Sequence, residues 1–131
     1  MADNISLIET RIANYLESLG YGTVGTDIWY GELPSTPDNA ILVTPAPGPE
    51  PDRYLDTEYP YLDIWVRNNS TLVARQKIDA IFRSLQHVAN VTFGDYYVYF
   101  INAVGNPLSR DRDGQNRHLY QLTIQVICHK P

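Results

Sequence analysis

The residues that could carry metal or redox chemistry in this chain are three histidines and one cysteine. His87, His118 and His129 are too far apart in the sequence to form the paired ligands that one helix can supply. Cys128 and His129 are adjacent in a segment that alternates like a strand, so their side chains point to opposite faces. A single cysteine also excludes an internal disulfide. We therefore expect no metal, no other cofactor and a buried Cys128.

Two glycine-containing segments resemble ligand-binding loops. Residues 20–25 read GYGTVG, which fits the G-x-G-x-x-G pattern of dinucleotide-binding loops. That loop binds phosphate when a strand precedes the glycines and a helix follows, and here the order is reversed. Residues 111–114 read DRDG, like the start of a calcium loop, but the later ligands are missing. We interpret the first segment as a helix stop with a connector and the second as a turn.

Catalytic motifs of the common hydrolases, phosphate-binding enzymes and zinc proteases are absent from the sequence. Arg110, Arg112 and Arg117 form only a small basic group, which two aspartates interrupt. The net charge of −5 has the wrong sign for attraction to nucleic acid. We expect neither an enzyme nor a nucleic-acid-binding protein, and keep as an alternative a small enzyme or ligand-binding domain whose site lies in residues 20–25 and 111–114.

Aromatic residues are the more informative feature, because the chain holds ten tyrosines. Residues 96–101 read YYVYFI and are aromatic or apolar on both faces, whereas a strand with one solvated face alternates. Trp65 extends this pattern, and Tyr and Trp are enriched at protein interfaces. We predict a subunit or partner interface at these residues, with cover by a helix or a loop as the alternative.

Two amphipathic helices and five strands are predicted to position these residues. Ile5 to Leu19 carry apolar side chains three and four residues apart, with Asn4 or Ser6 as the cap and a stop at Gly20. Ser6 and Glu9 have the capping-box spacing. A second helix is predicted from a cap at Asn69–Ser70 to Gln86, burying Leu72, Ala74, Ile78, Ile81, Phe82 and Leu85. The predicted strands are 26–30, 40–44, 61–67, 96–104 and 117–128.

The length of 131 residues, 44% of them hydrophobic, fits a single domain over residues 1–131. No apolar run approaches the roughly 20 residues that cross a bilayer, and we expect a soluble protein made in a cytoplasm, with no membrane partner. The predicted elements give an α+β fold in which two helices pack on one face of a mixed, mainly antiparallel sheet.

Charge and proline are unevenly distributed along the chain. Residues 1–66 have a net charge of −9 and residues 67–131 a net charge of +4. This split permits oppositely charged surfaces that meet head to tail between copies, unless the fold interleaves the two halves. Six of the nine prolines lie in residues 34–51, and the run from Pro45 to Asp52 predicts a stiff, exposed loop that either binds a partner or is simply solvated.

Three stretches, in this order around the two helices, resemble the tail-terminator or minor capsid proteins of long-tailed bacteriophages. They are residues 33–43 (LPSTPDNAILV), 58–67 (EYPYLDIWVR) and 106–117 (NPLSRDRDGQNR). The resemblance implies a structural virion protein at the head–tail junction, without an active site. It implies a ring, typically of six copies, that caps the tail tube, stops its polymerisation and docks the head connector. The net negative charge and the acidic loop around Asp52–Glu58 suggest in addition an acidic lumen through which DNA passes without specific binding.

The positions of residues in the chain, rather than a family motif, suggest which of them make these contacts. Another neck component, such as a head-completion or stopper protein, is the nearest alternative. The candidates for subunit contacts are Tyr96, Tyr97, Tyr99 and Trp65, and those for tube or connector contacts are Asp52, Arg53, Asp56, Glu58, Arg110, Arg112 and Arg117.

Overall fold

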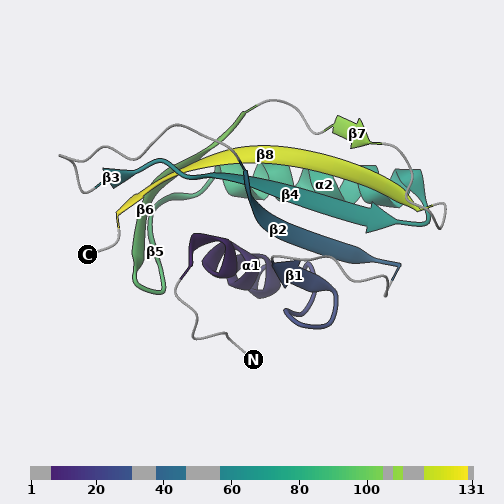
Figure 1. The fold of residues 1–131 in the computed structure, drawn as a ribbon, viewed down its shortest axis with the longest axis horizontal. Coiled ribbons are helices and arrows are strands. Elements are labelled where there is room, and N and C mark those ends of the chain that lie inside the picture. Colours follow the sequence, from purple (N-terminus) through teal and green to yellow (C-terminus); the bar gives the residue numbers. More distant parts are fainter. Residues whose placement is uncertain (1–6, 31–37, 47–56, 105–107, 111–116, 130–131) are drawn as a thin grey trace.

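The computed structural model describes residues 7–30, 38–46, 57–104, 108–110 and 117–129. These residues form two helices and one eight-stranded sheet, as predicted for an α+β fold (Figure 1). In chain order the elements are α1 (Ile8–Ser18), β1 (Ile28–Tyr30), β2 (Ala40–Ala46), β3 (Thr57–Glu58), β4 (Tyr61–Asn68), α2 (Thr71–Gln86), β5 (Ala89–Phe93), β6 (Tyr96–Ala103), β7 (Leu108–Arg110) and β8 (His118–His129).

The longest strand, β8, is the centre of the sheet. The main strand order is β1-β2-β4-β8-β6-β5, and the short strands β3 and β7 also pair with β8. All four pairings of β8 are antiparallel, and β1 with β2 is the parallel pair. The mixed, mainly antiparallel sheet is therefore confirmed. The strands of the acid-rich first half, β1, β2 and β4, are neighbours on one side of the sheet, and β8, β6 and β5 of the second half follow on the other, so the two sequence halves are segregated in the main strand order.

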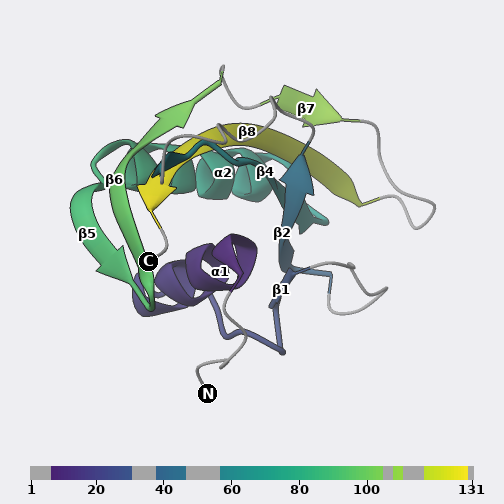
Figure 2. The ribbon, with the colours of Figure 1, turned by 60° about the vertical axis from the view of Figure 1, so that its left-hand side comes forward.

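Alternation along β8 produces one buried face. Leu122, Ile124 and Val126 are almost fully buried, whereas the residues between them are half-exposed on the other face. On the buried face they join apolar side chains of α1 and α2 in one cluster. Figure 2 shows the sheet curling around α1, with β1 and β2 on one side and β5 and β6 on the other. We call the opposite, half-exposed face the outer face.

Helix α1 begins and ends at recognisable local signals. Thr10 receives a hydrogen bond from the Leu7 N–H at 3.3 Å and donates one to the Leu7 carbonyl at 2.7 Å. The helix thus begins at Ile8, later than the predicted Ile5, and Asn4 and Ser6 lie outside the described residues. Gly20 has a φ of +89°, and the N–H groups of residues 20 and 21 bond back to the last helical turn, so the predicted stop is confirmed.

Helix α2 agrees with the prediction except at two of its predicted core residues, Leu72 and Phe82. Ser70 caps it by accepting a hydrogen bond from the Val73 N–H at 3.4 Å, and its last residue is Gln86. Ala74, Ile78, Ile81 and Leu85 are buried as expected. Leu72 is exposed, because two residues of helix turn it about 200° from Ala74, away from the buried stripe. Phe82 lies at the margin of that stripe and is only partly buried.

Three strands were absent from the prediction. They are β3, β5 and β7, of two, five and three residues, and each lies at the margin of the sheet. Short edge strands have little apolar periodicity, since only part of one face is covered. In β5, for example, Ala89, Asn90 and Thr92 are exposed, and Asn90 has a φ of +52°.

Truncating the centre of β8 should be costly. Ile124→Ala removes a fully buried side chain from the middle of the cluster and is expected to lower the free energy of unfolding by about 2–5 kcal/mol. Urea unfolding followed by circular dichroism measures this loss. The exposed helix variant Gln76→Ala is the control and should stay within about 0.5 kcal/mol of the parent protein. Equal stabilities for the two variants would contradict the assigned core.

Candidate functional site

An exposed group of aromatic residues lies on β6. Tyr97 and Tyr99 are each 37% exposed and Phe100 is 44% exposed. The rings of Tyr97 and Tyr99 meet edge to face with their centroids 5.0 Å apart. We call these three residues the β6 aromatic patch. Rings held in fixed positions at a surface can enter a partner's pocket at little further entropic cost, so the patch is suited to protein contact.

A register shift in β6 creates the patch. Between Val98 and Phe100 the pairing with β8 slips by one residue, so that Tyr99 is the extra residue of a bulge. Val98 and Ile101 both remain buried despite their odd spacing. The two residues between them are therefore left in solvent, which explains why residues 96–101 are apolar without alternation.

The other predicted interface residues are placed differently. Tyr96 is buried in the core, and burial, followed by the nearby charge of Glu58, raises the pKa of its hydroxyl. Trp65 is half-buried on the outer face, in register with Leu42 of β2 and Gln121 of β8. Of the four predicted interface residues, only Tyr97 and Tyr99 are therefore exposed side by side on β6.

Of the seven predicted tube or connector residues, the structure describes three. Glu58 is half-buried on β3, opposite Cys128 of β8. Arg110 lies on β7, in register with Leu119. Asp52, Arg53, Asp56 and Arg112 lie outside the described residues.

Arg117 is a buried side chain within the chain itself. Its guanidinium contacts the Asp38 carboxylate at 3.3 Å, and the other oxygen of Asp38 accepts a hydrogen bond from the Asn69 amide at 2.9 Å. Beside them the Asn68 side chain donates to Asn39. These contacts join the start of β2, the turn before α2 and the start of β8. Arg117 therefore holds three segments together, whatever it also contacts in an assembly.

Two main-chain N–H groups of the glycine-containing segment 20–25 are hydrogen-bonded to carboxylates of this chain. The Val24 N–H donates to the Glu17 carboxylate at 2.8 Å, and the Thr23 N–H donates to Asp27 at 2.6 Å. At Gly22, a Cβ atom would lie 2.5 Å from the Asp27 carboxylate. Since these carboxylates occupy the donors that a phosphate would need, this geometry does not support the nucleotide interpretation. Residues 111–114 lie outside the described residues.

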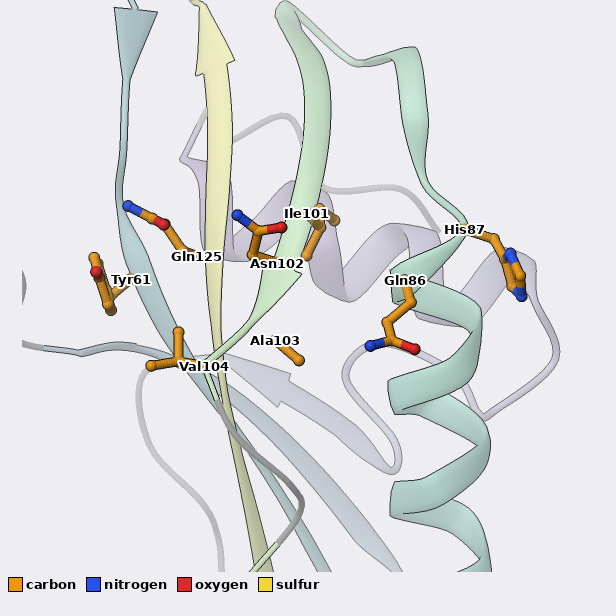
Figure 3. A pocket seen from close by; sticks show the side chains of 8 residues that line it. All are labelled: Tyr61, Gln86, His87, Ile101, Asn102, Ala103, Val104 and Gln125. Atoms are coloured by element: carbon orange, nitrogen blue, oxygen red, sulfur yellow. The ribbon is translucent and has the colours of Figure 1, made fainter.

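An open hollow of about 610 Å³ lies between the last residues of β6 and the end of α2 (Figure 3). It is wide but mostly polar, and it has no buried acid–base pair. Within the described ranges, we find no group of three or more His, Cys, Asp and Glu side chains placed to hold a metal ion, and no helix long and apolar enough to span a membrane. The lining residues are Tyr61, Gln86, His87, Ile101, Asn102, Ala103, Val104 and Gln125.

Comparison with known protein families identifies the chain. Residues 15–129 match the family model described as bacteriophage tail terminator protein. The chain belongs to this family. The match covers α2, every strand and the last residues of α1, from Tyr15 onward.

A solved structure has a related fold. A chain of the virion of a native gene transfer agent particle superposes with a TM-score of 0.57 at 14% identity, covering 80% of each chain. Curated protein sequences gave no match. With the family, this supports a structural protein of a phage tail, a virion component that contacts other phage proteins.

Two surface features of this tail terminator family member were not predicted. Phe100 was not among the predicted interface residues, although it lies in the unbroken apolar run of residues 96–101 that indicated an interface. No sequence pattern indicates the hollow beside β6, because its position depends on where β5 stops pairing with β6, and strand β5 itself was not predicted.

Cys128 should be unreactive in the folded protein. It is fully buried, and burial together with the charge of Glu58 raises its pKa to about 12, so the thiol stays protonated at pH 8. Reaction with Ellman's reagent is expected only after urea unfolding. Stoichiometric labelling of the folded protein within minutes at pH 8 would contradict this burial.

Arg117→Gln should lower stability by about 1.5–3 kcal/mol, because a buried charged hydrogen bond to Asp38 is lost. The melting temperature of the purified protein measures this. Arg75→Gln removes an exposed ion pair with Asp79 and should have a much smaller effect, since water screens it. An unchanged melting temperature for Arg117→Gln, combined with loss of binding to phage tails, would instead favour a direct contact role.

Proposed function

We propose that this protein caps the phage tail tube as a closed ring of identical copies, typically six. The ring stops tube polymerisation and provides the docking surface for the head connector at the head–tail junction. Membership of the tail terminator family supports this function. The single structural observation that carries it is the β6 aromatic patch, in which three large rings are exposed and two of them, Tyr97 and Tyr99, contact each other edge to face.

A closed ring uses head-to-tail contacts, in which each copy presents two different surfaces. The β6 aromatic patch supplies one of them, at the β5–β6 end of the sheet. The β1 end is chemically different: its described carboxylates include Glu17, Asp27 and Asp38, and β1 has only three residues. This difference between the two ends is compatible with head-to-tail contacts.

DNA must cross such a ring on its way out of the head. The net charge of −5 favours passage without binding, because like charges repel the phosphate backbone. We assign segments 45–60 and 109–117, which include β3 and the end of β7, to tube or connector contacts, with Asp52, Arg53, Asp56, Glu58, Arg110 and Arg112 as contact candidates. Another neck component remains the second candidate function, since a virion fold also fits a stopper.

Tyr99→Asp should weaken ring assembly by about 30-fold or more, which corresponds to a hot-spot loss of about 2 kcal/mol. A buried carboxylate at the contact would have no partner, whereas Tyr99 is exposed in the single chain and its replacement should leave the fold intact. Light scattering and binding to terminator-free tail tubes measure assembly. Circular dichroism verifies folding.

Tyr99→Phe is the matched control, because it keeps the ring and its edge-to-face contact with Tyr97. It should assemble like the parent protein. If Tyr97→Asp and Tyr99→Asp both assemble and bind tubes normally, the patch is not the subunit contact. A chain that stays monomeric at high concentration and never binds tubes would contradict the terminator function itself.

A further inference from the structure

The last residues of β6 have an open edge. On one side β6 pairs with β8 as far as Ala103. On the other side its pairing with β5 ends at Phe100, which is in register with Ala89. Among the residues that the structure describes, no strand pairs with Ile101–Ala103 on that side, and the 610 Å³ hollow lies there instead (Figure 3).

The register shows which peptide groups face this edge. The Val104 N–H donates to the Thr123 carbonyl at 2.9 Å, so Val104 and, two residues earlier, Asn102 bond toward β8. Because hydrogen bonding alternates along an antiparallel strand, the N–H and C=O groups of Ile101 and Ala103 point away from β8. They are two donors and two acceptors without a strand partner, placed symmetrically about Asn102.

We propose that this edge pairs with the same edge of a second copy, antiparallel and with Asn102 on the two-fold axis. In this register Ile101 of each copy faces Ala103 of the other, and both outward groups of each residue find a partner. Four main-chain hydrogen bonds result. The pairing stops at Val104, because Ala89 already occupies the edge beside Phe100.

The side chains around the edge favour a second copy as the occupant. A two-fold axis places identical residues opposite one another, so a charged edge would repel itself. The hollow contains no Lys, Arg, Asp or Glu among its lining residues, and its amides at Gln86, Asn102 and Gln125 can pair with their own kind. Val104, which is 51% exposed in the single chain, would become more buried at each end of the paired segment.

This contact is separate from the proposed ring. A two-fold contact uses the same patch on both copies, whereas a ring uses two different patches, so both can exist in one assembly. The edge therefore links two rings or two free subunits. Natural proteins commonly protect open strand edges with charge or proline, and Ile101–Ala103 has neither.

Cysteine cross-linking of the full-length chain tests the register. In the proposed pairing the two Asn102 residues form a non-hydrogen-bonded pair with Cα atoms about 4.5 Å apart, within the range of disulfide geometry. Asn102→Cys should therefore give a covalent dimer on mild oxidation. Gln125→Cys, which lines the same hollow from β8, is the matched control and should stay largely uncross-linked. The native Cys128 is buried and should not compete.

A proline variant separates edge pairing from random collision. Ala103→Pro deletes the outward N–H while leaving the bonds toward β8 in place, so in the Asn102→Cys background it should reduce the disulfide dimer at least fivefold. Ala103→Val keeps the N–H and should retain the dimer. Equal cross-linking of Asn102→Cys and Gln125→Cys, or no effect of Ala103→Pro in a folded protein, would overturn the proposal. Neither result would affect the ring, which the Tyr99 variants test.

Discussion

The pairing of β8 along both of its edges is the constraint on which the rest of the structure depends. This one strand joins β4 and β3 on one side to β6 and β7 on the other, and its apolar face forms the middle of the core. Helix α2 lies across β4, β8 and β6, and α1 fills the curl that these strands produce. A slip of one residue in β8 would turn Ile124 toward solvent and Thr123 into the core. The register of β8 therefore fixes the position of each surface discussed above.

Much of this arrangement could be predicted because it depends on periodicity. The helical spacing of α2 and the alternation of β8 are properties of the residues themselves, and so is the stop at Gly20. The burial of Tyr96 and the exposure of Tyr99 could not be predicted, because a bulge in β6 decides which ring faces the core. The sequence predicts a contact role for Arg117 but not its burial against Asp38, which depends on the meeting of segments about 80 residues apart. Long-range pairing of this kind leaves no local sequence pattern.

The same physics explains why the proposed functional site is a set of surfaces. The acidic groups near the glycine-containing segment accept its amide protons, and Cys128 is protonated and buried. Polar groups with strong chemistry are thus already used within the chain. Among the residues that the structure describes, the exposed features include the three rings of the β6 aromatic patch and the open edge at Ile101–Ala103. Both are suited to contacts with other protein chains, as expected for a structural protein of a phage tail.

The most direct test of the proposed capping function is the length distribution of tails assembled in cells that lack this protein, measured by electron microscopy. Capping predicts tails that grow past the normal length and remain unattached to heads, and it predicts that supplying the protein restores both the length and the attachment. Tails of normal length that join heads in its absence would contradict the account.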